Sequence, residues 1–334
     1  MALVINDSSY AGTWETEAFI IPAIYELDTL EKGVAFIKTG IKKKHTIGTA
    51  DMASPLRQRK AQPDLAGNAA MTIGARVLEP TDVMAFTTFN PRDLEVHWET
   101  ESLSDILLSR DLPATVSSYM IMLMMGRAKE GLEKGLHQGS TAYSSIVDVD
   151  DARYAVQFFD GFIKKLVVDG TYTPVPTPIA LTAANIIEKM NAAITAMATT
   201  TGGKALMSSI NRFKRLKFAM SVEDVELYDT ACAALDFKGS NVFEANIRKH
   251  KNFEIVTLAG LPKDTFYFAW LDTSIEGQLF VGMNSFEDMQ IETGKVTTYG
   301  EEYFAKALWK FDTQIAKPTE FVLYTALTEA DFEV

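Results

Sequence analysis

The side chains that most often perform chemistry are few in this sequence, and their spacing gives them no shared task. None of the four histidines, at positions 45, 97, 137 and 250, stands at metal-ligand spacing to another histidine or to Cys232, the single cysteine. His137 at the end of a predicted helix and His45 after three lysines are expected to face solvent, and neither shows the partner that catalysis by histidine needs. The sequence therefore predicts no metal centre and no catalytic histidine.

An acidic string at Asp148, Asp150 and Asp151 is the best candidate for a cation site. Carboxylates of this kind could bind a hard cation such as calcium or magnesium. The further spaced ligands of a calcium loop are missing, however, so the string is more typical of a solvated loop.

A phosphate-binding loop is suggested by Gly203 and Lys204 in the segment ATTTGGKA. Ala198 replaces the first glycine of that pattern, and Ala205 replaces the hydroxyl that would hold magnesium. A helix is predicted before the segment, where the pattern requires a strand. Since the patterns GxSxG, HExxH and GxGxxG after a strand are also missing, the sequence indicates neither an enzyme nor a cofactor.

Composition and charge indicate a folded protein without a general nucleic-acid surface. The 334 residues are 47% hydrophobic with a mean hydropathy of +0.01, enough for a core and for two domains. A net charge of −12 argues against a general nucleic-acid binder. No apolar run approaches the length of a membrane span, and the start MALVINDSSYAGTWETEAF lacks the features of a signal peptide. A single cysteine suits the cytoplasm or a particle assembled inside a cell.

Charge is distributed unevenly along the chain. Against the single acid Asp51, residues 38–60 carry seven basic side chains: Lys38, Lys42, Lys43, Lys44, Arg57, Arg59 and Lys60. The last fifteen or so residues are acidic, with Glu320, Glu329, Asp331 and Glu333. This polarity favours head-to-tail contact between copies of the chain. The alternative, a solvated face or a flexible arm for each run, stays open.

Hydrophobic periodicity predicts an extended arm at residues 1–17, a short helix and strand at 16–38, and a long loop at 49–74. The segment MTIGARVLEPTDVMAFTTFNPRDLEVHWE has two β-rich runs around Pro80 and Asp82, which we interpret as a long β-hairpin arm. The clearest helix spans residues 113–137, with apolar side chains at fourfold spacing, opened by Pro113.

The second half mixes helices and strands. A helix is predicted from about Thr182 and another at 222–235, opened by Ser221. Strands are predicted at 213–220 and 252–258, then a turn at Gly260, Leu261 and Pro262, and further strands to the end of the chain. The simplest fold class that accounts for these elements is α+β.

This order of elements resembles the major capsid proteins of tailed bacteriophages, which share the Hong Kong 97-type fold. Three segments carry the resemblance. KRLKFAMSVEDVELYDTACAAL resembles a strand followed by a helix, and FEIVTLAGLPKDTFYFAW resembles two strands joined by a Gly-Leu-Pro turn in the axial domain. EEYFAKALWKFDTQIAKPTEFVLY resembles the last part of that fold, which returns to the peripheral domain. The resemblance covers roughly residues 20 to 325 and lies in the order of elements, since no single motif is diagnostic.

The resemblance implies a division of the chain into the parts of that fold. An N-terminal arm with the first peripheral elements takes residues 1–48, and an extended loop of β-hairpin character takes 49–98. A peripheral domain with the long "spine" helix 113–137 takes 99–180, an axial domain takes 181–288, and residues 289–334 return to the peripheral domain.

The resemblance also implies function and partners. The chain is expected to be a non-enzymatic shell protein of the virion, assembled in the host cytoplasm as pentamers and hexamers around double-stranded DNA that it does not read by sequence. Scaffold, portal and decoration proteins are further expected partners; cofactors and membranes are not. The candidate subunit contacts are Lys42, Lys43, Lys44, Arg57, Arg59 and Lys60. An encapsulin-like compartment shell, a tail-tube subunit and a connector subunit remain the alternatives.

Overall fold

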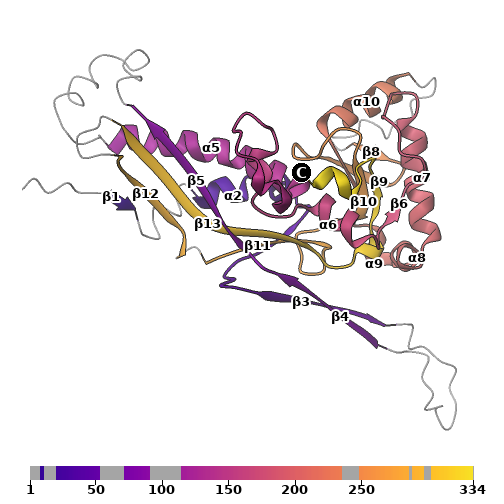
Figure 1. Cartoon of the computed structure of the whole chain (residues 1–334). Coiled ribbons are helices and arrows are strands. Elements are labelled where there is room, and N and C mark those ends of the chain that lie inside the picture. Colours follow the sequence, from indigo (N-terminus) through magenta and orange to yellow (C-terminus); the bar gives the residue numbers. More distant parts are fainter. Residues whose placement is uncertain are drawn as a thin grey trace, which may run out of the picture.

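Two mixed layers of sheet and helix form the body of the molecule, and a β-hairpin projects from one edge (Figure 1). The computed structural model describes residues 8–10, 20–52, 71–90, 114–234, 248–285, 288–296 and 302–333. Within these ranges the strands form two six-stranded sheets and one two-stranded sheet. The α+β class predicted from the sequence is confirmed.

The first sheet is built around the long strand β13. Its strand order is β1 (Ser8–Tyr10), β12 (Gln290–Lys295), β13 (Tyr303–Ile315), β11 (Leu279–Met283) and β2 (Phe36–Lys38), with β5 (Thr81–Phe89) also paired to β13. All of these pairs are antiparallel except the parallel pair of β2 and β11. Burial alternates along β13, as expected for a sheet with one face against a core.

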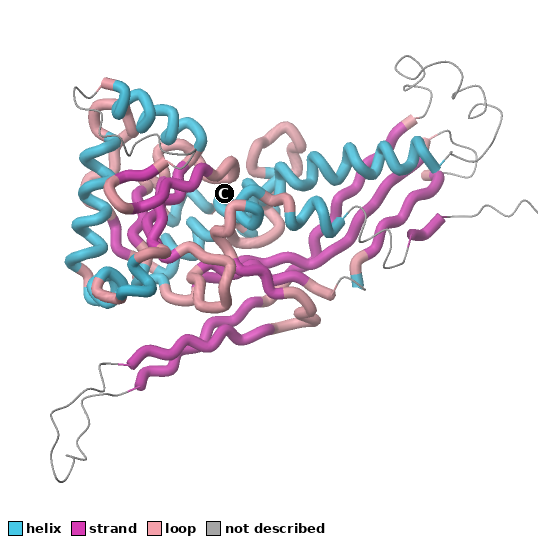
Figure 2. The backbone as a smooth tube through the Cα atoms, turned by 180° about the vertical axis from the view of Figure 1, so that it is seen from behind, coloured by secondary structure: helices cyan, strands magenta, loops and turns pink. Residues whose placement is uncertain are grey.

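The long helix α5 (Ala114–Gln138) covers that inner face (Figures 1 and 2). Its 25 residues make a rod of about 37 Å. The predicted helix is thereby confirmed, with each end shifted by one residue. The short helices α2 (Ile21–Tyr25), α3 (Asp28–Glu31) and α6 (Phe162–Asp169) belong to the same half of the molecule, and α2 and α6 contact α5.

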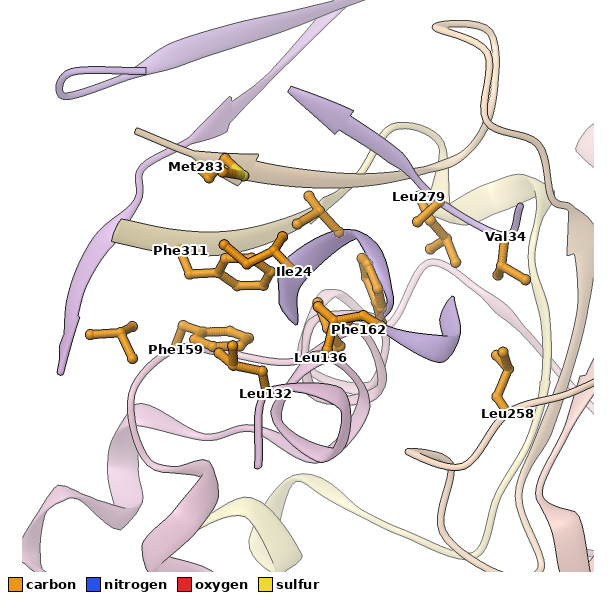
Figure 3. Packing of buried hydrophobic residues seen from close by; sticks show 14 of the residues in the cluster. Ile24, Val34, Leu132, Leu136, Phe159, Phe162, Leu258, Leu279, Met283 and Phe311 are labelled. Atoms are coloured by element: carbon orange, nitrogen blue, oxygen red, sulfur yellow. The ribbon is translucent and has the colours of Figure 1, made fainter. Parts of the chain in front are cut away.

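A single hydrophobic core joins α5 to the first sheet. Figure 3 shows Leu132 and Leu136 of α5 beside Phe162 of α6 and Phe311 of β13. The rings of Phe159 and Phe311 lie 5.3 Å apart between centroids. The buried side chains recur every fourth residue near the end of α5, which explains why that periodicity was visible in the sequence.

The second sheet has the strand order β6 (Thr173–Pro174), β14 (Val322–Tyr324), β10 (Phe266–Trp270), β7 (Leu216–Met220), β9 (Phe253–Thr257) and β8 (Lys249–His250). Its helices are α7 (Ile186–Thr199), α8 (Thr201–Met207), α9 (Ile210–Phe213) and α10 (Val222–Ala233). Side chains of this sheet and these helices form a second buried cluster. The short 3₁₀ helices are η3 (Thr141–Ser145), η4 (Tyr154–Val156), η6 (Pro318–Glu320) and η7 (Glu329–Phe332).

One predicted helix start in this half is confirmed and another is shifted. Ser221 caps α10 by accepting a hydrogen bond from the backbone N–H of Asp224 at 3.1 Å, as predicted. Helix α7 begins at Ile186, one turn later than the predicted start, because Thr182 instead opens a turn closed by Asn185. The glycines after α7 do not end helical structure, since they lie inside α8.

The two halves share the first hydrophobic core, which also includes Ala219, Tyr267 and Leu323 of the second sheet, and the end of α5 contacts the turn between β9 and β10. The side-chain amide of Gln138 donates to the carbonyl of Gly260 at 2.7 Å, and the N–H of Ala259 donates to Asp28 of α3 at 3.0 Å. A Cβ atom at Gly260 would lie 2.2 Å from the carbonyl oxygen of Glu133. The close approach of α5 to this turn therefore requires glycine.

The projecting hairpin consists of β3 (His45–Met52) and β4 (Met71–Leu78). The pairing of its strands differs from the prediction, in which the two runs on either side of Pro80 paired with each other to form the hairpin. Both runs are strands, but β4 pairs with β3, and β5 pairs with β13 in the first sheet. The reason is tertiary: β13 offers β5 nine paired positions and a buried site for Val83.

Candidate subunit-contact surfaces

The hairpin has one apolar face. Because alternate side chains of a strand point to the same face, Met71, Ile73, Ala75 and Val77 of β4 lie together on one side. Ile73 is 75% exposed and Met71 is 59% exposed. Apolar side chains this exposed on a strand without a second layer are typical of contact surfaces.

The opposite face of the hairpin is polar toward its outer end and anchored at its root. Leu78 and Ile47 are buried there together with Phe280 of the first sheet. Arg76 forms an ion pair with Asp169 at the end of α6, and this hydrogen bond holds the pKa of the Asp169 carboxyl below its usual range. The hairpin therefore leaves the body with one face already occupied.

Further contacts at the root fix the direction of the hairpin. Gln314 of β13 donates to the carbonyl of Val77 at 2.6 Å, and the N–H of Glu79 donates to Asp312 at 2.8 Å. Lys165 of α6 donates to the other Asp312 oxygen at 2.8 Å. A pocket of about 270 Å³ beside these groups has a mixed charged lining, made up of Arg76, Asp160, Lys164, Lys165, Val168, Asp169 and Gln314. Its described basic side chains already pair with carboxylates, so it is a poor site for a free anion.

The basic residues predicted as subunit contacts divide into two groups. Lys42, Lys43 and Lys44 lie in the turn between buried Ile41 and β3, at the hairpin root, and all three are exposed. Lys44 forms an ion pair with Glu79 at 2.9 Å. Arg57, Arg59 and Lys60 lie outside the described residues.

The outer face of the first sheet carries a second apolar surface, on the side away from α5. Cross-strand register places Met84 opposite Leu308, and Phe86 stacks on Phe304 with 6.2 Å between ring centroids. Met84 and Phe86 are about half exposed. Ion pairs of Lys306 with Glu292 and of Lys310 with Asp82 lie beside this group.

The acidic string lies in the loop between η3 and η4, where it builds a turn. Asp148 accepts a hydrogen bond from the N–H of Asp150 at 3.0 Å, and Asp151 pairs with Arg153 at 2.8 Å. Hydrogen bonds from the side chain and the backbone N–H of Arg153 lower the pKa of Asp151 to about 2. Across the described ranges, no group of three or more histidine, cysteine or acidic side chains could hold a metal ion.

The acidic tail also differs from expectation at one position. Glu320 is buried rather than solvated, and it accepts a hydrogen bond from Gln278 and lies 3.4 Å from Lys317. Burial raises the pKa of this carboxyl. The residue therefore fixes η6 against the body, and only the positions after it remain available for contacts.

The histidines occupy four different environments. His45 is half-buried on β3, His97 lies outside the described residues, and His137 and His250 are buried. For His137 this corrects the expectation of a solvent-facing side chain. Helix α3 and the Gly260 turn cover the last turns of α5, which the sequence near His137 could not reveal.

Around His137 a buried polar cluster ties α3 to α5. The hydroxyl of Thr29 donates to Glu133 at 2.5 Å and lies 2.8 Å from Nε2 of His137. With the hydroxyl hydrogen directed to Glu133, Nε2 of His137 is the donor to Thr29. Hydrogen bonds and the nearby imidazole hold the pKa of Glu133 below its usual range although burial opposes them. All three side chains are buried, so the cluster has no access to a substrate.

His250 belongs to the second sheet. Its Nε2 lies 3.1 Å from the amide oxygen of Asn191 on α7, and its ring packs edge-on against Tyr228 of α10. Burial, with a smaller effect of Lys251, lowers the pKa of His250 to about 4. The phosphate-loop candidate is likewise structural, since Gly203 and Lys204 lie within α8 and do not follow a strand.

Comparison with known proteins gives matches only at the level of structure. No family model matches the sequence, and no curated protein matches it. A chain of the satellite phage P4 procapsid, in a structure that includes the size determination (Sid) protein, aligns over 92% of this chain and 98% of its own length, with 10% identity and a TM-score of 0.56. The capsid of Ralstonia phage GP4 aligns over 98% of this chain and 93% of its own, with 12% identity and a TM-score of 0.50.

These likenesses and the topology define the class of the fold. The chain has the Hong Kong 97-type fold of tailed-phage major capsid proteins, with a long helix against the first sheet, a separate second sheet and a projecting hairpin. The fold that the sequence predicted is confirmed. None of the helices in the described ranges is long and apolar enough to span a bilayer.

Proposed function

We propose that this chain is a major capsid protein whose copies assemble into the icosahedral shell of a tailed bacteriophage. The observation that carries the proposal is the agreement of its fold, over nearly the whole chain, with a subunit of the phage P4 procapsid. It has no enzymatic role in this proposal, and its place is the capsid of the virion.

The surface chemistry supports self-association. A two-stranded hairpin is at best marginally stable in water unless another layer covers it. Here the root is anchored by Arg76 and Gln314, while Met71 and Ile73 on the free face stay exposed. A neighbouring copy that covers this face would remove the apolar area from water and complete the second layer. We assign the hairpin, most of which falls within the predicted loop 49–98, to such a contact.

The basic turn at the hairpin root supports the same role. Exposed lysines on an acidic protein attract the acidic surface of another copy and help to orient it. Lys42, Lys43 and Lys44 are thus proposed subunit contacts, as are Arg57, Arg59 and Lys60 farther along the loop. The net charge of −12 is compatible with a shell that encloses double-stranded DNA without binding it tightly.

Closed shells of this fold require rings of five and six copies, so we propose pentamers and hexamers as the assembly units. Scaffold, portal and decoration proteins are further proposed partners. The domain division given above is carried forward as part of the same proposal, with three strands as departures: β6 and β14 join the second sheet, and β11 joins the first.

The test is electron microscopy and sedimentation of the purified full chain, compared with one pair of variants. The change Ile73→Asp places a charge on the free hairpin face, and Ile275→Asp makes the same change at a similarly exposed isoleucine in the loop between β10 and β11. We expect shells, or pentamers and hexamers, from the wild type and from Ile275→Asp, and unassembled chains from Ile73→Asp. A wild-type chain that stays monomeric at every protein and salt concentration would overturn the proposal.

A further inference from the structure

The loop of residues 146–151, here called the acidic loop, presents apolar and acidic side chains in alternation. Val147 is 86% exposed and Val149 is 69% exposed, and Asp148 and Asp150 beside them are also exposed. Among the large hydrophobic side chains of the described residues, Val147 is the most exposed. A surface of this composition fits a partner that offers both apolar contact and positive charge.

Internal contacts hold the acidic loop in a defined turn. The N–H of Asp151 donates to the carbonyl of Asp148 at 3.2 Å, in addition to the Asp148 side-chain contact described above. Arg153 pairs with Asp151 and also lies over the ring of Tyr143, whose hydroxyl donates to the carbonyl of Asp331 at 2.7 Å. The loop is therefore preorganised, which reduces the entropy that a partner must remove on binding.

Lys42 and Lys43, here called the lysine pair, have the complementary chemistry. Both are exposed, and within the described ranges neither forms an ion pair, in contrast to Lys44 with Glu79. The lysine pair precedes β3, whose Thr46 stands opposite the half-exposed Val77. Positive charge and an apolar strand face thus lie near one another at the hairpin root.

The two surfaces lie on opposite edges of the molecule. In Figures 1 and 2 the hairpin leaves the lower edge, and the segment that follows α5 lies at the upper edge. The acidic loop of one chain consequently does not reach its own lysine pair. Complementary surfaces on opposite edges join copies head to tail, and such contacts close into rings when the rotation between copies permits it.

From these observations we infer that the acidic loop of one copy binds the lysine pair and the adjacent hairpin root of the next copy. This inference rests on the proposed function, because it names the partner surface of a self-assembling chain. Val147 and Val149 pack near Val77, and Asp148 and Asp150 face the two ammonium groups. Since exposed ion pairs add little affinity individually, the main effect of the contact is to fix the orientation of neighbouring copies.

Charge reversal on each side, and then on both sides together, tests the contact. One variant combines Lys42→Glu with Lys43→Glu. The other combines Asp150→Lys with Asp148→Asn, which keeps the oxygen that accepts from the N–H of Asp150. Asp151 stays unchanged because it pairs with Arg153. We expect each variant to raise the concentration needed for assembly by at least about tenfold, and the combination to recover most of that loss.

A matched control separates this contact from a general effect of charge. Lys204→Glu with Lys214→Glu makes the same change in net charge at two exposed positions away from the hairpin, and it is expected to leave assembly unchanged. If both charge-reversal variants assemble like the wild type, or if their combination is no better than the worse of the two, the contact is refuted while the capsid function stands. A wild type that never associates refutes both.

A disulfide between copies provides a second measurement. Val147→Cys and Val77→Cys are combined in a chain with Cys232→Ala, which removes the buried native thiol. Oxidation of assembled particles should link chains into ladders, since the two thiols come from different copies. The control pair, Val77→Cys with Ile275→Cys, should leave the chains unlinked, because Ile275 is also largely exposed, at 71%, but lies in another loop. Particles in which the first pair also fails to link would contradict the contact.

Discussion

Acid should destabilise the second sheet through His250. The side chain is only 7% exposed, and it is held between Asn191 of α7 and Tyr228 of α10. Burial disfavours the imidazolium form, and Lys251 adds a smaller repulsion. The folded protein consequently keeps His250 neutral at a pH where an unfolded chain would already bind a proton.

The magnitude follows from the difference between the two pKa values. The pKa of His250 falls from 6.5 to about 4 on folding. At about 1.4 kcal/mol per unit, this corresponds to roughly 3 kcal/mol of stability. Because the folded pKa is the lower one, the unfolded state binds more protons between these values. Stability contributed by His250 is therefore complete above about pH 7, decreases as the pH falls through 6, and is lost by about pH 4.

Urea unfolding of the unassembled chain between pH 7.5 and 4 measures this effect, with His250→Gln as the matched variant. Glutamine keeps a donor for the Asn191 oxygen and does not titrate. Other groups contribute to the pH dependence of both proteins, so the difference between the two curves isolates His250. We expect the wild type to lose roughly 3 kcal/mol more than the variant over this range. Parallel curves would refute the assignment of a depressed pKa to a buried His250.

Two further changes test contacts that set the architecture. Gly260→Ala should lower the free energy of unfolding by roughly 1–3 kcal/mol, because its Cβ would meet the Glu133 carbonyl. Gly126→Ala, whose Cβ would have no atom within 4 Å, should instead stabilise α5 by up to about 1 kcal/mol. Equal melting temperatures for the two variants would contradict this account. Asp169→Asn should weaken the hairpin root by roughly 1 kcal/mol, seen as faster hydrogen exchange of β4 amides, while Lys44→Ala at the more exposed ion pair with Glu79 should change it less. Since the pKa of Asp169 is lowered in the folded chain, the same loosening should develop in the wild type only as the pH falls below the ordinary aspartate range. Protection factors of the β4 amides that do not change with pH would exclude the ion pair as the cause.

Part of the candidate contact surface was visible in the sequence. The run Lys42–Lys44 and the acidic string at 148–151 are both evident as charge clusters, and each could equally have been a solvated face. What the sequence did not reveal is that Val147 and Val149 project from a fixed turn, or that the two clusters lie on opposite edges. Exposure and relative position depend on the whole fold, so charge patterning alone left the choice open.

Elements with local signals could be predicted from short stretches of sequence. Helix α5 has its periodicity, α10 has Ser221 as its cap, and the turn after β9 has Gly260. Each signal acts through residues a few positions apart, by hydrogen bonds at helix ends or by the spacing of apolar side chains. The order of such elements was enough to suggest the Hong Kong 97-type fold.

Only the tertiary structure decided how the strands pair and which polar side chains are buried. Strand β5 joins β13, and β4 turns away to pair with β3, although β4 and β5 are neighbours in sequence. His137, expected in solvent, lies under α3 and the Gly260 turn with Thr29 as its partner. In each case the deciding partner is far away along the chain, and the free energy of its contact is set by burial and register that no local window of sequence contains.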